Sequence, residues 1–168
     1  MNEPMTNDGD TGLTGQVLIA MPGMLDPRFA HSVVYLCAHS PEGAMGLIFN
    51  KPVADLGLGE LLEQLEVPVT DDFRQSRLHF GGPVEQGRGF VLHTPDYESP
   101  VATLHVDEMV SMTATMDILE EIGAGRGPRR RLVALGYAGW GPGQLEMELG
   151  QNGWLTCEPD PALLFDRP

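Results

Sequence analysis

Hydrophobic residues along the chain fall into short strand-like runs with two helical stripes between them. Each run is rich in apolar or β-branched side chains and is bounded by turn residues, which predicts a strand. The predicted strands cover residues 16–20, 32–39, 44–50, 77–80, 89–93, 102–106, 131–136 and 154–157. Leucines at positions 58, 61, 62 and 65 repeat with helical spacing and predict one amphipathic helix. A second helix is predicted from residue 113 or 115 to residue 122.

Glycine and tryptophan are concentrated in residues 136–155, which hold six glycines and both tryptophans. Glycine gives the backbone the freedom that tight turns need, whereas large aromatic side chains are typical of packed regions. The segment is therefore predicted to be a shaped turn that leads from a strand into a helix. Pro142 suits the first helical turn, and Leu145 and Leu149 would face the core together because they lie four residues apart.

The order of the predicted elements favours one domain. Strands and helices are mixed without a regular strand–helix–strand alternation, which favours an α+β fold over a doubly wound sheet. No internal repeat, low-complexity tract or proline-rich linker divides the chain. We therefore expect a single domain over residues 13–168, preceded by a disordered acidic tail over residues 1–12.

The charge of the chain narrows the choice of partners. The formal charge is −14, with 24 acidic and ten basic residues. Such a surface repels a phosphate backbone, so no direct nucleic-acid partner is expected. Four arginines gather within residues 126–131, where a solvated turn is favoured over an anion-binding patch.

Apolar length and cysteine content indicate the compartment. No apolar run approaches the roughly 18 residues that a membrane span requires, and the acidic N-terminus lacks the features of a signal peptide. We therefore expect no membrane association and a cytoplasmic location. Cys37 and Cys157 are predicted to be buried, reduced thiols, because disulfides are rare in that compartment.

The sequence predicts no catalytic residue, metal site or cofactor. The five histidines lack metal-type spacing, and two cysteines are too few for a structural zinc site. Neither glycine-rich turn, at residues 81–83 or 139–143, matches a phosphate-binding motif. Glu146 would lie near the start of a helix, where capping is favoured over acid–base catalysis. Lys51, the only lysine, is interpreted as an ion-pair anchor rather than a ligand-binding group.

Several short motifs follow one another along the chain. They are residues 22–24 with Phe29, 32–36 with His39, 43–46, 50–52, 81–84, 91–93, 136–140, 143–148, and Asn152 with Trp154. On these motifs, from about Gly15 to Trp154, the chain resembles the bacterial YqgE/AlgH family. The resemblance implies an α+β fold with a split sheet that is partly closed into a small barrel and flanked by helices. It implies no established activity. An older family label of transcriptional regulator gains little support from a charge of −14 and no helix-turn-helix pattern.

The first functional hypothesis is a module that binds a protein or a ligand, with an indirect regulatory role through a protein partner. Loops on a rigid scaffold commonly carry binding function, and the glycines and aromatic residues of this chain are concentrated in turns. The candidate binding surface comprises His39, Asn50, Lys51, Gly82, Pro83, His93, Trp140, Gln144 and Glu146.

The alternative hypothesis is an enzyme or a small-ligand protein. It requires four polar side chains, those of His39, Asn50, His93 and Glu146, to converge in one pocket. Binding without catalysis is favoured, because the motifs contain no recognisable catalytic set. The oligomeric state does not follow from either hypothesis.

Overall fold

Nine strands and three short helices make up the secondary structure of the residues that the computed structural model describes, which are 12–22, 27, 29–53, 57–68, 78–159 and 164–165. The strands are β2 (Val17–Ala20), β3 (Val33–Ser40), β4 (Gly43–Ile48), β5 (Leu78–Phe80), β6 (Val84–His93), β7 (Leu104–His105), β8 (Ser111–Thr113), β9 (Arg131–Trp140) and β10 (Trp154–Cys157). The helices are α2 (Leu58–Gln64), α4 (Met116–Gly123) and α5 (Gln144–Gly150).

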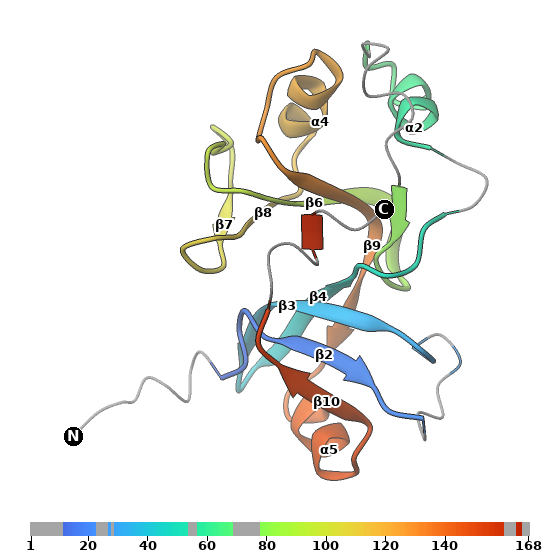
Figure 1. Cartoon of the computed structure of the whole chain (residues 1–168), viewed down its shortest axis with the longest axis vertical. Helices are drawn as coiled ribbons and strands as arrows, with labels where there is room; N and C mark the ends of the chain where they lie inside the picture. Colours follow the sequence, from blue (N-terminus) through green and yellow to red (C-terminus); the bar gives the residue numbers. More distant parts are fainter. Residues whose placement is uncertain are drawn as a thin grey trace.

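The strands form one open sheet in the order β10-β2-β3-β4-β9-β6-β8-β7, with β5 also paired to β9. The strand pairings are antiparallel except that of β5 with β9. Strand β9 pairs with different strands along its length, because residues 131–135 pair with β6 and residues 138–140 pair with β4. It joins a lower half-sheet, made of β10, β2, β3 and β4, to an upper half-sheet, made of β5, β6, β8 and β7 (Figure 1).

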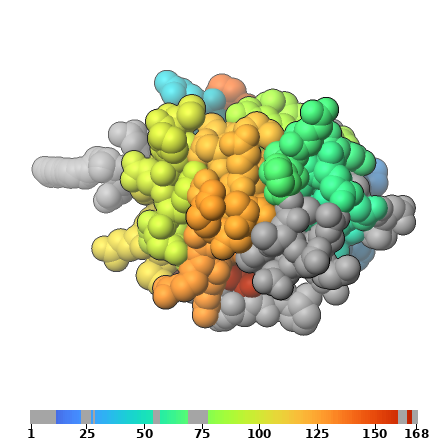
Figure 2. All heavy atoms as spheres, turned by 90° about the horizontal axis from the view of Figure 1, so that it is seen from above, coloured from blue at the N-terminus to red at the C-terminus, as the bar shows by residue number. Residues whose placement is uncertain are grey.

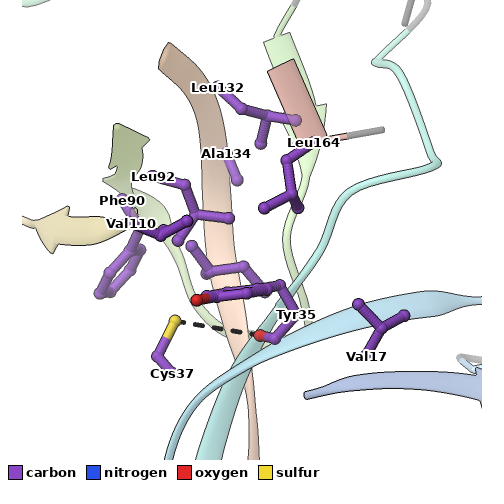
Figure 3. Packing of buried hydrophobic residues seen from close by; sticks show 10 residues of the cluster. Val17, Tyr35, Cys37, Phe90, Leu92, Val110, Leu132, Ala134 and Leu164 are labelled. Atoms are coloured by element: carbon purple, nitrogen blue, oxygen red, sulfur yellow. Dashed lines mark hydrogen bonds between the residues drawn. The ribbon is translucent and has the colours of Figure 1, made fainter. Parts of the chain in front are cut away.

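A hydrophobic cluster lies between the two half-sheets. Tyr35 and Cys37 on β3 contribute to it from the lower half-sheet, and Leu92 on β6 and Ala134 on β9 contribute from the other side (Figure 3). Leu164, near the C-terminal end of the chain, packs into the same cluster. Burial of a large apolar side chain contributes roughly 1.5–3 kcal/mol, so this cluster holds the two half-sheets together.

Helices cover the two outer faces of the sheet. Helices α2 and α4 lie side by side on the upper half-sheet, where Leu62 and Ile122 share a cluster with Val91 (Figures 1 and 2). Helix α5 packs on the lower half-sheet, where Leu145 shares a cluster with Leu36. Successive residues of β3 therefore face opposite clusters. Burial on both faces explains why residues 33–38 are almost continuously apolar.

The predicted α+β fold, with a split sheet partly closed into a small barrel and flanked by helices, is wrong. The described strands form a large and mainly antiparallel sheet that does not close into a barrel, and the helices have only seven, eight and seven residues. A barrel needs hydrogen bonds between its first and last strands. Here β10 and β7 end the strand order unpaired with each other, so the backbone hydrogen bonds of β9 join the two halves without closing them into a barrel.

Individual elements agree with the predictions better than the architecture does. The predicted helices correspond to α2, α4 and α5, but β9 continues through the predicted turn as far as Trp140, and the turn itself is residues 141–143. Strand β8 is absent from the predicted set, because its three residues Ser-Met-Thr form no apolar run. The predicted tail lies outside the described residues except for Gly12.

The cysteines follow the prediction in part. Both are free, and Cys37 is buried as predicted, but Cys157 is exposed at the end of the edge strand β10. Among the described helices, none is long and apolar enough to cross a membrane.

Candidate functional site

An open depression of about 490 Å³ is lined by the β3–β4 hairpin of the lower half-sheet and by β7 of the upper half-sheet. Its lining comprises Thr14, residues 37–40 and 42–45, Leu104, His105 and Trp140. We call it the hairpin depression. Side chains from both half-sheets meet there, so the depression exists only once the sheet has folded.

His39 is held at this depression by two hydrogen bonds with opposite roles. Its Nδ1 accepts the backbone N–H of Leu13 at 3.0 Å, so the ring proton lies on Nε2. Nε2 donates that proton to the carboxylate of Glu146, also at 3.0 Å. The His39 side chain is only 8% exposed, whereas that of Glu146 is 49% exposed. His39 thus links β3, the segment before β2 and helix α5.

Glu146 occupies the third position of α5 and combines a structural role with an accessible charge. A hydrogen bond from its own backbone N–H, and next the bond from His39, lower the pKa of the Glu146 carboxyl below its ordinary value. A carboxylate in the first turn also interacts favourably with the positive end of the helix. Glu146 is therefore ionised at neutral pH at the rim of the depression.

The sequence did not predict Glu148 as a site residue, but its carboxylate holds both tryptophan side chains in place by hydrogen bonds. Its Oε1 accepts the indole N–H of Trp140 at 2.9 Å and that of Trp154 at 2.8 Å. Its Oε2 accepts the side-chain amide of Gln144 at 3.1 Å. Phe29 packs against both indole rings, with centroids 6.3 and 5.9 Å apart. Trp140 is consequently only 6% exposed, so its ring is a buried support of the site and is not a contact surface for a partner.

A sequence signal for Glu148 exists. Buried indole N–H groups usually find an acceptor, and Glu148 is the carboxylate four residues from Gln144, on the same helix face. Gln144 uses its other amide atom, Oε1, to accept the backbone N–H of Gly141 at 2.9 Å and closes the turn before α5. Glu146 and Glu148 point in different directions from α5, since one contacts His39 and the other contacts the tryptophans.

Four other predicted site residues lie where chain segments are joined. Asn50 accepts the backbone N–H of Val33 and donates to the carbonyl of His31, both at 2.9 Å. The carbonyl of Lys51 accepts the backbone N–H of Phe80 at 2.8 Å. Pro83 follows Gly82, whose backbone crosses directly over β9. Asn50 and Lys51 follow the end of β4, whereas the hairpin depression lies at its start.

His93 belongs to a separate, buried network. Its Nδ1 donates to the carbonyl of Thr94 at 2.7 Å, so Nε2 accepts the hydroxyl of Thr113 at 2.8 Å. The hydroxyl of Thr103 donates in turn to that of Thr113 at 2.8 Å. Burial is the largest effect on His93 and lowers its pKa below the ordinary value of 6.5. His93 is therefore neutral and structural at neutral pH.

The buried His93 predicts a loss of stability in mild acid. A histidine with a lowered pKa in the folded state takes up its proton more readily when unfolded, so its contribution is complete above about pH 6.5 and is lost as the pH falls. At about pH 5 the loss reaches up to about 2 kcal/mol. Urea unfolding at about pH 7.5 and pH 5 should therefore show a smaller pH-dependent loss for His93→Gln than for the wild type. An equal pH-dependent loss in the wild type and in His93→Gln would contradict this account.

The four polar residues of the enzyme hypothesis do not form one hydrogen-bonded cluster. His39 and Glu146 are in contact, Asn50 joins two backbone segments, and His93 lies at the opposite end of β9 from Trp140, since it pairs with Arg131. Cys37 lines the depression, but burial raises the pKa of its thiol to about 12. Among the described residues, no group of three His, Cys, Asp or Glu side chains is arranged to hold a metal ion.

Known proteins are similar to this chain over most of its length. A family model described as AlgH-like matches residues 17–168. A UPF0301 protein of Cereibacter sphaeroides is 58% identical over 153 residues, which cover 91% of this chain and 83% of the relative. A UPF0301 protein of a Jannaschia species is 57% identical over 155 residues, which cover 92% of this chain and 81% of the relative.

Solved structures agree with this relationship. The solution structure of the AlgH protein from Pseudomonas aeruginosa, also a UPF0301 protein, is 46% identical and superposes with a TM-score of 0.82 over 98% of this chain and 86% of that one. A Corynebacterium diphtheriae protein, DIP2367, is 22% identical with a TM-score of 0.69 over 90% of this chain and 78% of that one, and it shares the fold alone. The resemblance found in the sequence motifs is confirmed, and the chain belongs to the AlgH-like family.

Proposed function

We propose that the protein is a cytoplasmic binding module that holds a partner protein at the hairpin depression. The observation that carries the proposal is the combination of an apolar wall and a fixed polar rim in one open surface. Leu104, which is 41% exposed, lies on the apolar wall, and the lining residue His39 holds the half-exposed carboxylate of Glu146 at the polar edge. Protein interfaces commonly combine an apolar centre with a polar edge.

The shape of the depression favours a macromolecular partner. Sites for small molecules are usually clefts that enclose most of the ligand. The hairpin depression is open, and it is bordered by a hairpin and an edge strand, to which a segment of another protein has access. An indirect regulatory role would act through such a partner, because a chain with a charge of −14 repels nucleic acid.

The chemistry of the lining supports binding over catalysis. A general base needs a free lone pair, but Nδ1 of His39 accepts the Leu13 N–H and Nε2 carries the proton. A cysteine nucleophile reacts as its thiolate, and the raised pKa of Cys37 keeps the thiol protonated at neutral pH. Both side chains are held as parts of a rigid surface.

Site-specific photocrosslinking in native cells tests this function. The full chain would carry benzoylphenylalanine at Glu42 or at Leu104, the two sides of the depression, or at the control position Glu120 on the exposed side of α4. We expect the same discrete adduct from positions 42 and 104 and none from position 120. The adduct at position 42 should decrease when Leu104→Asp is also present, because a charge replaces part of the apolar wall.

The partner protein identified in the adduct is then purified and mixed with the purified full chain. Binding that is lost with Leu104→Asp and retained with Glu120→Gln supports the proposal. Absence of an adduct at both lining positions, or the same adduct at position 120, would overturn it.

A further inference from the structure

We infer that the hairpin depression selects a cationic side chain, and specifically an arginine in a basic segment of the partner protein. This inference rests on the proposed function, because it names what the partner places in the depression. It follows from the charges at the rim together with the apolar wall that faces them.

Three carboxylates, which we call the acidic rim, either line the depression or contact one of its lining residues. Glu42 lines it directly, and Glu146 contacts the lining residue His39. Glu98 Oε1 lies 3.6 Å from Nε2 of His105, the lining residue on β7. The side chains of Glu98 and Glu146 are 70% and 49% exposed, so their charges are accessible to an incoming group.

Neither lysine nor arginine occurs among the described residues that line the depression. Both ring nitrogens of His39 are already engaged, Nδ1 by the Leu13 N–H and Nε2 by Glu146. An anionic ligand such as a phosphate or a carboxylate would therefore meet like charges, whereas a cation would meet opposite ones. Electrostatic complementarity of this kind selects partners and speeds their encounter.

The apolar part of the depression fits an arginine better than a compact ion. Leu104, Met45 and Ala44 lie in the lining beside the acidic rim. Long basic side chains pack their methylene stems on apolar surface and keep the charged head among polar groups. A guanidinium has five N–H donors in a planar fork and can serve two carboxylates at once, which an ammonium group, a compact point charge, does less well.

Amide NMR spectra of the ¹⁵N-labelled full chain test this selection with three matched probes: the N-acetyl amides of arginine, leucine and glutamate. We expect the arginine probe alone to shift the amide signals of residues 38–45 and 104–105. The shifts should shrink when the salt concentration rises from about 20 mM to about 500 mM, because exposed charges are screened.

Two double variants with the same change in net charge provide the control. Glu42→Gln with Glu98→Gln removes two rim carboxylates, and Glu66→Gln with Glu120→Gln removes two exposed carboxylates of the helical face. The rim variant should bind the arginine probe about fivefold more weakly, since each exposed ion pair contributes little by itself. The helical-face variant should bind it as the wild type does.

The outcomes separate this inference from the proposed function. Equal shifts with the leucine and arginine probes, or equal weakening in both double variants, would overturn the arginine selection. Shifts with none of the probes would also overturn it. If the crosslinked adducts at positions 42 and 104 persist in those cases, the binding function stands and only its selectivity is wrong.

Discussion

Gly82→Ala should abolish stable folding or cost more than about 4 kcal/mol of unfolding free energy. A Cβ atom at this position would lie closer than 3.0 Å to the backbone of Tyr137 and Ala138, a separation that real Cβ atoms essentially never show. The φ angle of +156° is a second obstacle, because residues other than glycine rarely adopt it. The contacting atoms belong to the backbone of β9, the strand shared by both half-sheets, so they cannot move aside without breaking the sheet.

Gly87→Ala is the matched control for this prediction. No atom lies within 4 Å of a Cβ at Gly87, and its φ angle is not positive. Urea unfolding followed by circular dichroism should give the control nearly the stability of the wild type, while the Gly82 variant unfolds at a much lower concentration or is insoluble. A Gly82→Ala protein as stable as the control would show that Gly82 does not cross β9 as closely as described.

The second large effect is expected at Glu148. Glu148→Leu leaves the indole N–H groups of Trp140 and Trp154 without their shared acceptor, and both rings are buried. A buried donor that loses its partner costs about 1–3 kcal/mol, so the two together should lower the unfolding free energy by about 2–5 kcal/mol. Tryptophan fluorescence during urea unfolding reports the change directly, because both indoles lie in the affected cluster.

Two variants separate this effect from a simple loss of charge. Glu148→Gln keeps an oxygen acceptor and should cost about 1 kcal/mol. Glu146→Gln, which removes a negative charge from the same helix but keeps an acceptor for His39, should leave the tryptophan fluorescence unchanged. If Glu148→Leu were as stable as Glu148→Gln, the indole hydrogen bonds would not support the cluster.

The local elements of the fold could largely be predicted from sequence. The runs at residues 32–39 and 44–50 correspond to β3 and β4, and the leucine spacing at 58–65 corresponds to α2. Strand and helix periodicities are local properties, so they remain visible in any sequence that buries those elements. The sequence did not predict β8 or the second half of β9 as strands. Their local patterns are weak, and their structure depends on the strands with which they pair.

The candidate site could be predicted only in part. His39, Trp140 and Glu146 were predicted site residues and do lie together, but Asn50, Lys51 and His93 lie elsewhere, and Glu148 was missed. Residues that are more than a hundred positions apart, such as His39 and Glu146, come into contact only through the order of strands. A single sequence contains no direct signal for that order.

The sequence by itself determined the family of this protein, its negative net charge and most of its strands and helices, because these depend on composition, short motifs and local periodicity. Only the tertiary structure decided that the sheet stays open, that side chains of the central cluster pack between its two halves, and that β7 comes to line a depression with the β3–β4 hairpin. The reason is that these features depend on contacts between distant segments, and such contacts arise from packing of the whole chain.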